Sequence, residues 1–265
     1  MPVLGLGVYR SFGEDAMTAS LAALKHGYRH IDSATLYRNE SGVGEAVRRS
    51  GIPRTDIFIT SKIQSPRQGY AETLAAVDTS LAKLEMDYID LYLVHDPRSG
   101  EKTRLDTYRA LIEKREDEGK LRSIGVSNYG LRHLEEIVEA GFELPAVNQI
   151  ELHPFCQQRE ISQWCRARGV VVQAYCPLMR MQKGKIDHPV LIAVAEKLQR
   201  TPTQISIRWS LQKGFVPLPK SIHEERIIEN ADVFAFDISE TDMLALDGLD
   251  LGSSGAIMQN PVDVE

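Results

Sequence analysis

The chain has 265 residues, of which 43% are hydrophobic and 26% are charged, and single-domain α/β barrels commonly have this size and composition. A net charge of −6 argues against nucleic acid or an anionic membrane as the main partner. The three cysteines, Cys156, Cys165 and Cys176, are an odd number without metal-ligand spacing, which predicts a reducing compartment and no metal site. With no basic leader and no long apolar run, the sequence predicts a cytoplasmic protein.

Apolar strands and amphipathic helices alternate along the chain, and glycines stop many of the helices. The predicted strands are 3–7, 29–33, 57–61, 89–94, 123–127, 147–150, 170–175 and 215–218. The predicted helices are 14–26, 40–49, 71–84, 104–118, 131–140, 159–168, 189–199, 203–213, 224–231 and 240–246, the last capped by Ser239. This alternation predicts parallel pairing in a closed (β/α)8 TIM barrel, as a single domain over residues 1–265.

Four ionisable residues lie at or just beyond the ends of consecutive predicted strands. Asp32 ends the second strand, Tyr37 follows in the next loop, and Lys62 and His95 end the third and fourth strands. All carboxyl ends of parallel barrel strands share one face, so these side chains are expected to converge there. Each residue alone would more often be an ion pair, a core residue or a packing residue, but their joint placement favours a proton-transfer site.

The four residue types suit protonation of an oxygen that becomes an alcohol. A free tyrosine has a pKa of about 10 and is a poor acid at neutral pH. We expect the Lys62 ammonium to lower the pKa of Tyr37, and Asp32 to keep Lys62 charged and oriented. His95 can hydrogen-bond a substrate oxygen beside Tyr37.

Along almost its whole length the chain resembles the aldo-keto reductase family. The matching motifs are Gly5-Leu6-Gly7-Val8-Tyr9, Gly27-Tyr28-Arg29-His30-Ile31-Asp32-Ser33-Ala34 with Tyr37, Ser61-Lys62, Leu93-Val94-His95, Gly125-Val126-Ser127-Asn128, Asn148-Gln149 and Pro219-Lys220-Ser221. The resemblance implies a catalytic tetrad of Asp32, Tyr37, Lys62 and His95, with Tyr37 as general acid–base and a nicotinamide cofactor as hydride source. Relatives usually carry a β-hairpin before strand 1, whereas this chain begins at strand 1.

Polar residues at the later strand ends are expected to hold the nicotinamide. Hydroxyl and amide groups of Ser127, Asn128 and Gln149 can hydrogen-bond a carboxamide, and the resemblance gives them this role. Tyr175 could stack on the nicotinamide ring. In similar proteins the region of Pro177 and Leu178 carries the pyrophosphate, here through backbone groups and packing.

After the last strand, a Lys–Ser pair enters a helix that carries an arginine in its first turn. Such an arrangement is either an anion site or a solvated helix start. The resemblance places the adenosine 2′-phosphate here, which favours NADPH, while His223 replaces the usual Ser/Thr and leaves NADH possible. The residues of this adenosine site are Lys220, Ser221, His223, Arg226, Glu229 and Asn230.

The resemblance places the substrate pocket around Tyr9, Gln64 and Asp96, the last two at positions where many relatives have tryptophan. The pocket is therefore expected to be more polar than theirs, with the loops 96–104 and 179–187 and the tail 252–265 setting specificity.

These features predict a cytoplasmic, monomeric NADPH-dependent reductase that transfers hydride to the carbonyl of a small aldehyde or ketone, reversibly with the alcohol. A redox-sensing regulatory module is an alternative, since potassium-channel β-subunits resemble this fold, bind the cofactor and turn over slowly. A barrel lyase or isomerase fits poorly, because it leaves Asn128, Gln149 and Tyr175 without a role.

Overall fold

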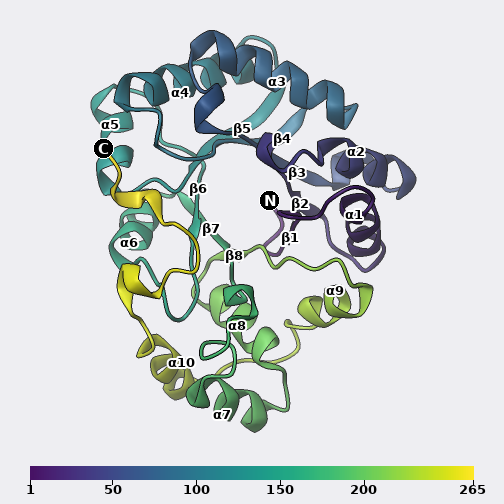
Figure 1. The fold of residues 1–265 in the computed structure, drawn as a ribbon, viewed down its shortest axis with the longest axis vertical. Coiled ribbons are helices and arrows are strands. Elements are labelled where there is room, and N and C mark those ends of the chain that lie inside the picture. The colour runs from purple at the N-terminus through teal and green to yellow at the C-terminus, as the bar shows by residue number, and fades with distance from the viewer.

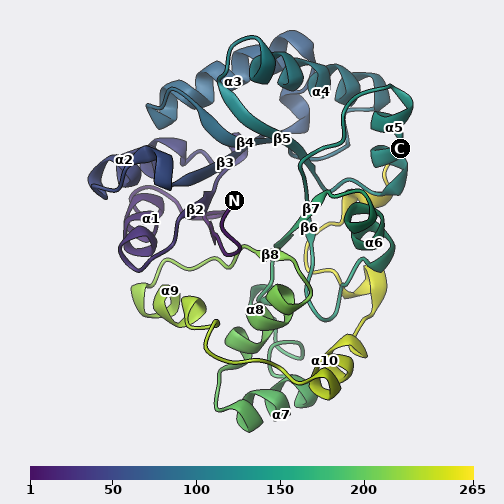
Figure 2. The ribbon, with the colours of Figure 1, turned by 180° about the vertical axis from the view of Figure 1, so that it is seen from behind.

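The computed structural model describes all 265 residues, and its strands form a ring enclosed by helices (Figures 1 and 2). Each strand pairs in parallel with the next along the chain. The N–H groups of Gly5 and Gly7 donate to the carbonyl oxygens of Pro217 (3.2 Å) and Pro219 (3.0 Å), which joins the first strand to the last. The predicted (β/α)8 barrel is confirmed. Its strands are β1 (Leu6–Gly7), β2 (His30–Asp32), β3 (Phe58–Ile63), β4 (Ile89–Val94), β5 (Leu121–Ser127), β6 (Val147–Glu151), β7 (Val171–Tyr175) and β8 (Val216–Pro217).

Every predicted helix is present, with two helices between β7 and β8. The largest boundary errors are three residues. One is at α4, which starts directly after Gly100 (φ 83°), and the other is at β1, which was predicted to start at residue 3. The predicted Ser239 cap is confirmed, since its Oγ accepts from the Asp242 N–H at 3.2 Å. The helices are α1 (Asp15–Lys25), α2 (Glu40–Arg49), α3 (Tyr70–Leu84), α4 (Glu101–Glu116), α5 (Leu131–Glu139), α6 (Arg159–Ala167), α7 (Pro189–Leu198), α8 (Pro202–Gln212), α9 (Glu224–Ala231) and α10 (Glu240–Asp247).

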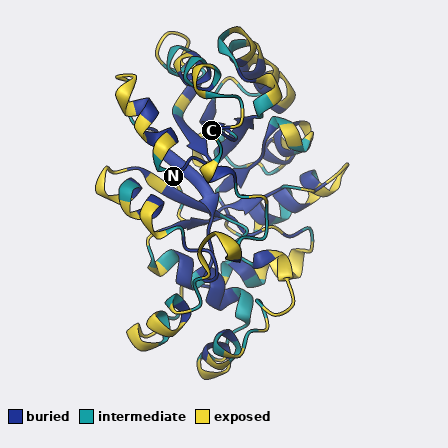
Figure 3. Cartoon of the chain, turned by 60° about the vertical axis from the view of Figure 1, so that its left-hand side comes forward, coloured by how far each residue is buried: buried dark blue, intermediate teal, exposed yellow.

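Side chains on a strand alternate between the barrel interior and the layer beneath the helices. On β4, Leu91 and Leu93 belong to a small inner cluster with Val147, whereas Tyr92 and Val94 belong to the large outer core. Figure 3 shows buried residues along the strands and inner helix faces, with exposed residues on the outer helix surfaces. No helix has the length and apolar character that crossing a bilayer requires.

The same alternation brings the polar strand-end residues into the barrel. On β3, Lys62 shares the inner side with Thr60, and Thr60 pairs with Asp32 of β2. The strand continues to Ile63, beyond the predicted end, because Lys62 and Ile63 pair with Leu93 and Val94. Lys62 is therefore inside the barrel mouth rather than in a loop above it.

The C-terminal tail after α10 runs past α6 to α5, along one side of the barrel, on the face turned toward the viewer in Figure 1. It contains two short 3-10 turns, Gly252–Gly255 and Pro261–Asp263. A Cβ atom at Gly255 would overlap the carbonyl oxygen of Phe155, so only glycine allows this close approach. The tail is thus packed onto the loop that follows β6.

Candidate active site

Asp32 and Lys62 form a buried ion pair at the barrel mouth. Lys62 has no exposed side-chain surface, and its Nζ donates to Asp32 Oδ1 at 2.5 Å and to the Ser33 carbonyl oxygen at 2.8 Å. Asp32 Oδ2 accepts from Gln149 Nε2 at 2.7 Å. Burial lowers the pKa of Lys62, and the charge of Asp32 and its hydrogen bond oppose that shift. The two residues hold each other in one geometry.

The Tyr37 hydroxyl lies at the other side of the same ammonium group. Lys62 Nζ is 3.4 Å from the Tyr37 hydroxyl oxygen, and the Tyr37 ring is tilted against Tyr9 with ring centroids 4.9 Å apart. Burial, and secondly the charge of Asp32, raise the pKa of Tyr37 well above its usual range. The net shift is therefore upward, opposite to the lowering expected from Lys62, and burial is its largest cause. The hydroxyl keeps its proton at neutral pH.

His95, just beyond β4, faces the Tyr37 ring edge-on with centroids 5.7 Å apart. Its Nδ1 is buried and has no hydrogen-bond partner. Burial lowers the pKa of His95 to about 3, and the charges of Lys62 and Arg98 act in the same direction. The imidazole is therefore neutral at physiological pH and offers one N–H donor beside the Tyr37 hydroxyl.

The predicted nicotinamide contacts form one hydrogen-bonded network. Asn128 Nδ2 donates to the His95 carbonyl oxygen at 2.9 Å and to Ser127 Oγ at 3.1 Å, while Asn128 Oδ1 accepts from the Tyr175 hydroxyl at 2.8 Å. Gln149 Nε2 donates to Asp32 Oδ2 and to Gln173 Oε1, both at 2.7 Å. Asn128 is thus fully engaged within the protein, whereas Gln149 keeps an unpaired Oε1 acceptor.

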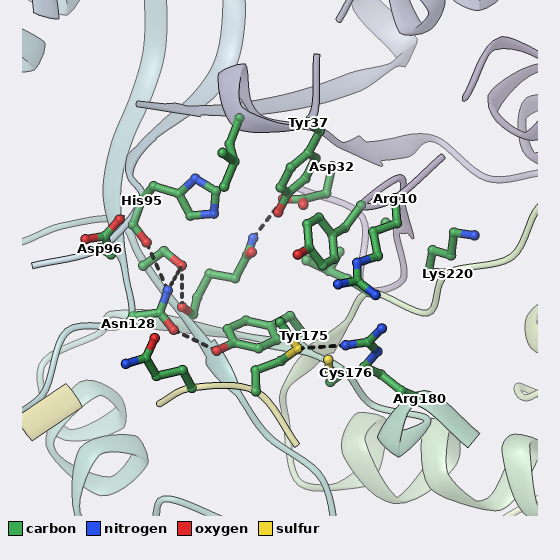
Figure 4. Close-up of a pocket in the computed structure, with 18 of the residues that line it drawn as sticks. Arg10, Asp32, Tyr37, His95, Asp96, Asn128, Tyr175, Cys176, Arg180 and Lys220 are labelled. Carbon is green, nitrogen blue, oxygen red and sulfur yellow. Dashed lines mark hydrogen bonds between the residues drawn. The ribbon is translucent and has the colours of Figure 1, made fainter. Parts of the chain in front are cut away.

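One cavity of about 510 Å³ gathers these groups (Figure 4). Of the predicted tetrad, Asp32, Tyr37 and His95 line it, and Lys62 is buried directly behind them. The other predicted site residues in its wall are Tyr9, Asp96, Ser127, Asn128, Gln149, Tyr175, Pro177, Leu178 and Lys220.

Besides Lys62, six predicted site residues lie outside this wall: Gln64, Ser221, His223, Arg226, Glu229 and Asn230. His223 precedes α9, and its N–H donates to Ser221 Oγ at 3.0 Å. Glu229 Oε1 accepts from the Thr201 and Thr203 hydroxyls at 2.7 and 2.6 Å, so its carboxylate already has partners on α8 and its cap. Ser221, His223 and Arg226 lie around the start of α9, whereas Glu229 and Asn230 lie in its last turn and Gln64 follows β3.

The sequence did not identify several cavity residues individually, although most of them lie in the loops and tail that were expected to set specificity. They are Gly7, Arg10, Leu36, Arg98, Cys176, Arg180, Met181, Leu218, Met258, Gln259 and Pro261. Of these, Arg10 directly follows the Gly7-Val8-Tyr9 motif, and Arg98 follows His95 by three residues. Their position beside a motif was the available sequence signal. Cys176 and the other two cysteines are free thiols.

Glu151 at the end of β6 fixes the tail that forms part of this wall. Its fully buried carboxylate accepts from the N–H groups of Ile257 (2.5 Å) and Met258 (2.9 Å) and from His153 Nε2 at 3.0 Å. The tail residues Met258, Gln259 and Pro261 line the cavity. Glu151 does not itself line the cavity, but it positions the tail residues that form one side of it.

Replacing Glu151 with glutamine should displace the tail, because one carboxylate oxygen becomes an NH₂ group that cannot accept a backbone hydrogen bond. We expect KM for a carbonyl substrate to rise about tenfold, the cost of an unpaired buried donor, with a smaller change in kcat. Steady-state kinetics and protease sensitivity of the tail measure this. The exposed Glu160→Gln is the matched control, and an unchanged KM with an unchanged digestion pattern would contradict the prediction.

A sequence model of the aldo/keto reductase family matches residues 3–251. The chain belongs to the aldo-keto reductase family. It is 47% identical over 250 residues to a glyoxal reductase of Bacillus subtilis (strain 168), covering 94% of this chain and 89% of that protein.

Solved aldo-keto reductases have the same fold. One from a Medee basin deep-sea metagenome library is 41% identical, with a TM-score of 0.94 over 100% of this chain and 96% of the other. The aldo-keto reductase of Bombyx mori, solved in complex with NADP, is 30% identical, with a TM-score of 0.90 over 98% and 92% of the two chains. The family resemblance of the sequence motifs is thus confirmed.

Proposed function

We propose that this aldo-keto reductase is an NADPH-dependent reductase of small aldehydes and ketones, reversible with the alcohol, in which Tyr37 is the proton donor. The observation that carries the proposal is the Asp32–Lys62–Tyr37 series of contacts, at 2.5 and 3.4 Å, that ends in the same cavity as His95. The similarity to a glyoxal reductase supports a small carbonyl substrate.

The residues of the cavity fit a nicotinamide cofactor. Gln149 has an unpaired Oε1 that can accept from a carboxamide NH₂, and the Tyr175 ring forms part of the same wall. Lys220 lines the cavity toward α9, where Ser221, His223 and Arg226 surround the helix start. We assign the nicotinamide to the first group and the adenosine phosphate to the second. The NADP complex of the Bombyx mori relative supports NADPH over NADH.

When bound, this cofactor supplies the hydride that adds to the carbonyl carbon. The His95 N–H donates to the carbonyl oxygen and orients it beside Tyr37. Tyr37 gives its proton to that oxygen as negative charge develops, and the Lys62 ammonium stabilises the phenolate that remains. Asp32 and the Ser33 carbonyl oxygen keep the ammonium aimed at Tyr37 while this happens.

A carbonyl panel tests the proposal. Oxidation of NADPH and of NADH is followed in parallel with glyoxal, methylglyoxal, small aldehydes and ketones, and cofactor binding is measured by fluorescence. We expect turnover with small aldehydes and faster turnover with NADPH. Tight cofactor binding with negligible turnover across the panel would instead favour a redox-sensing module.

A further inference from the structure

The cavity carries excess positive charge, although the chain has a net charge of −6. Two acidic residues line it, and one of them, Asp32, is paired with Lys62. Four basic side chains line it, and none of them makes an ion pair within the protein: Arg10, Arg98, Arg180 and Lys220. Unpaired cations around a cavity favour anionic ligands.

These cations occupy two sides of the cavity. In Figure 4, Arg10, Arg180 and Lys220 lie together on one side, whereas His95 and Asp96 lie on the other. Arg98 belongs to the second side, because its backbone N–H donates to Asp96 Oδ1 at 3.1 Å. Burial lowers the pKa of His95 and raises that of Tyr175, and the charge of Arg98 adds to the first shift and opposes the second. If the phosphates of the cofactor bind beside Lys220, as the proposed function has it, Arg98 is left without an anion.

The loop around Arg98 holds its backbone but leaves its guanidinium free. Asp96 and Arg98 form a side-chain-to-backbone turn, and the Asp96 carbonyl oxygen accepts from Gln68 Nε2 at 2.9 Å. The Asp96 carboxylate points away from the centre of the cavity in Figure 4. The Arg98 side chain donates no hydrogen bond to the protein and is exposed. The backbone of Arg98 is held in place, and its guanidinium is free to bind a ligand.

We propose that Arg98 determines specificity by binding a carboxylate on the carbonyl substrate, so that oxo acids are preferred over neutral carbonyl compounds. A planar guanidinium matches a carboxylate with two parallel hydrogen bonds. A monoanion suits this side of the cavity better than a dianion. Arg98 is the single cation on this side, and the nearby Asp96 carboxylate would repel a second negative charge. The inference rests on the proposed carbonyl reduction and adds the substrate class.

The test compares glyoxylate, 4-oxobutanoate and 5-oxopentanoate with their neutral amides, which differ from them in charge and little in shape. We expect wild-type kcat/KM to favour at least one acid about tenfold, mainly through KM. Arg98→Met should remove that preference, and Arg98→Lys should keep part of it. The matched control is Arg67→Met, since Arg67 is exposed, unpaired and in the loop after β3, but outside the cavity.

The outcomes separate this inference from the function on which it rests. A wild-type enzyme that reduces acids and amides with equal kcat/KM would overturn the role of Arg98 and leave the reductase intact. So would an acid preference that survives in Arg98→Met, or that Arg67→Met reduces equally. Absence of NADPH oxidation with both series and with the neutral carbonyl panel would overturn the proposed function itself.

Discussion

Tyr37→Phe is expected to lower kcat for carbonyl reduction about 100- to 10,000-fold, the usual contribution of a positioned general acid. The substitution removes the hydroxyl that lies 3.4 Å from Lys62 Nζ and keeps the ring that packs against Tyr9 and His95. Cofactor binding should therefore stay close to that of the wild type. Initial rates of NADPH oxidation, with NADPH affinity measured by fluorescence, check both parts.

Tyr92→Phe is the matched control for this experiment. Tyr92 is also fully buried, and its hydroxyl lies 3.1 Å from Ser80 Oγ on the outer side of β4, away from the cavity. Loss of that hydroxyl should leave kcat within a few-fold of the wild type. Wild-type turnover in Tyr37→Phe would show that another group supplies the proton, and the proposed mechanism would fail.

The arrangement of the tetrad could be predicted from the sequence because it depends on regular structure. Strand spacing identified the barrel, and the barrel requires strand ends to share a face. Asp32 and His95 lie where this rule puts them. Lys62 lies one residue before the end of its strand rather than at the end, because β3 extends to Ile63. Only the positions of the strand ends were needed, and these depend on hydrophobic patterning.

The electrostatics of Tyr37 could not be predicted in the same way. The direction of its pKa shift depends on how much water the packed site excludes, and this burial comes from neighbours such as Tyr9 and His95. The sequence indicates both the ammonium and its carboxylate partner, but it does not indicate how completely packing buries the Tyr37 hydroxyl.

The tail shows a second limit. Glu151 lies 106 and 107 residues before Ile257 and Met258, and it binds their backbone N–H groups, which almost any residue would supply. No residue type in the tail marks this contact. Conversely, the family resemblance places Glu229 in the adenosine site, while in the structure its carboxylate accepts from the Thr201 and Thr203 hydroxyls.

Lys62→Met is expected to destabilise the fold by about 3–5 kcal/mol, because Asp32 would remain buried without its cation. Adding Asp32→Asn removes that charge and should recover much of the lost stability. The two variants should nevertheless share a fall in kcat of about 100-fold or more, since neither supplies the charge beside Tyr37. Urea unfolding at fixed pH gives the stabilities, and NADPH oxidation below the unfolding transition gives kcat.

Arg54→Met separates stability from catalysis in this comparison. Arg54 Nη2 lies 2.7 Å from the buried Asp90 Oδ2, an ion pair beside the amino ends of β3 and β4, at the opposite end of the barrel. Breaking that pair should lower stability while kcat of the folded protein stays near the wild-type value.

If the Lys62→Met, Asp32→Asn double variant regained wild-type kcat together with its stability, Lys62 would be a structural residue alone. If both Lys62 variants remain inactive while Arg54→Met keeps wild-type kcat, the Asp32–Lys62 pair serves catalysis. The reason would be that burial opposes ionisation of Tyr37, so the phenolate needs the Lys62 ammonium beside it.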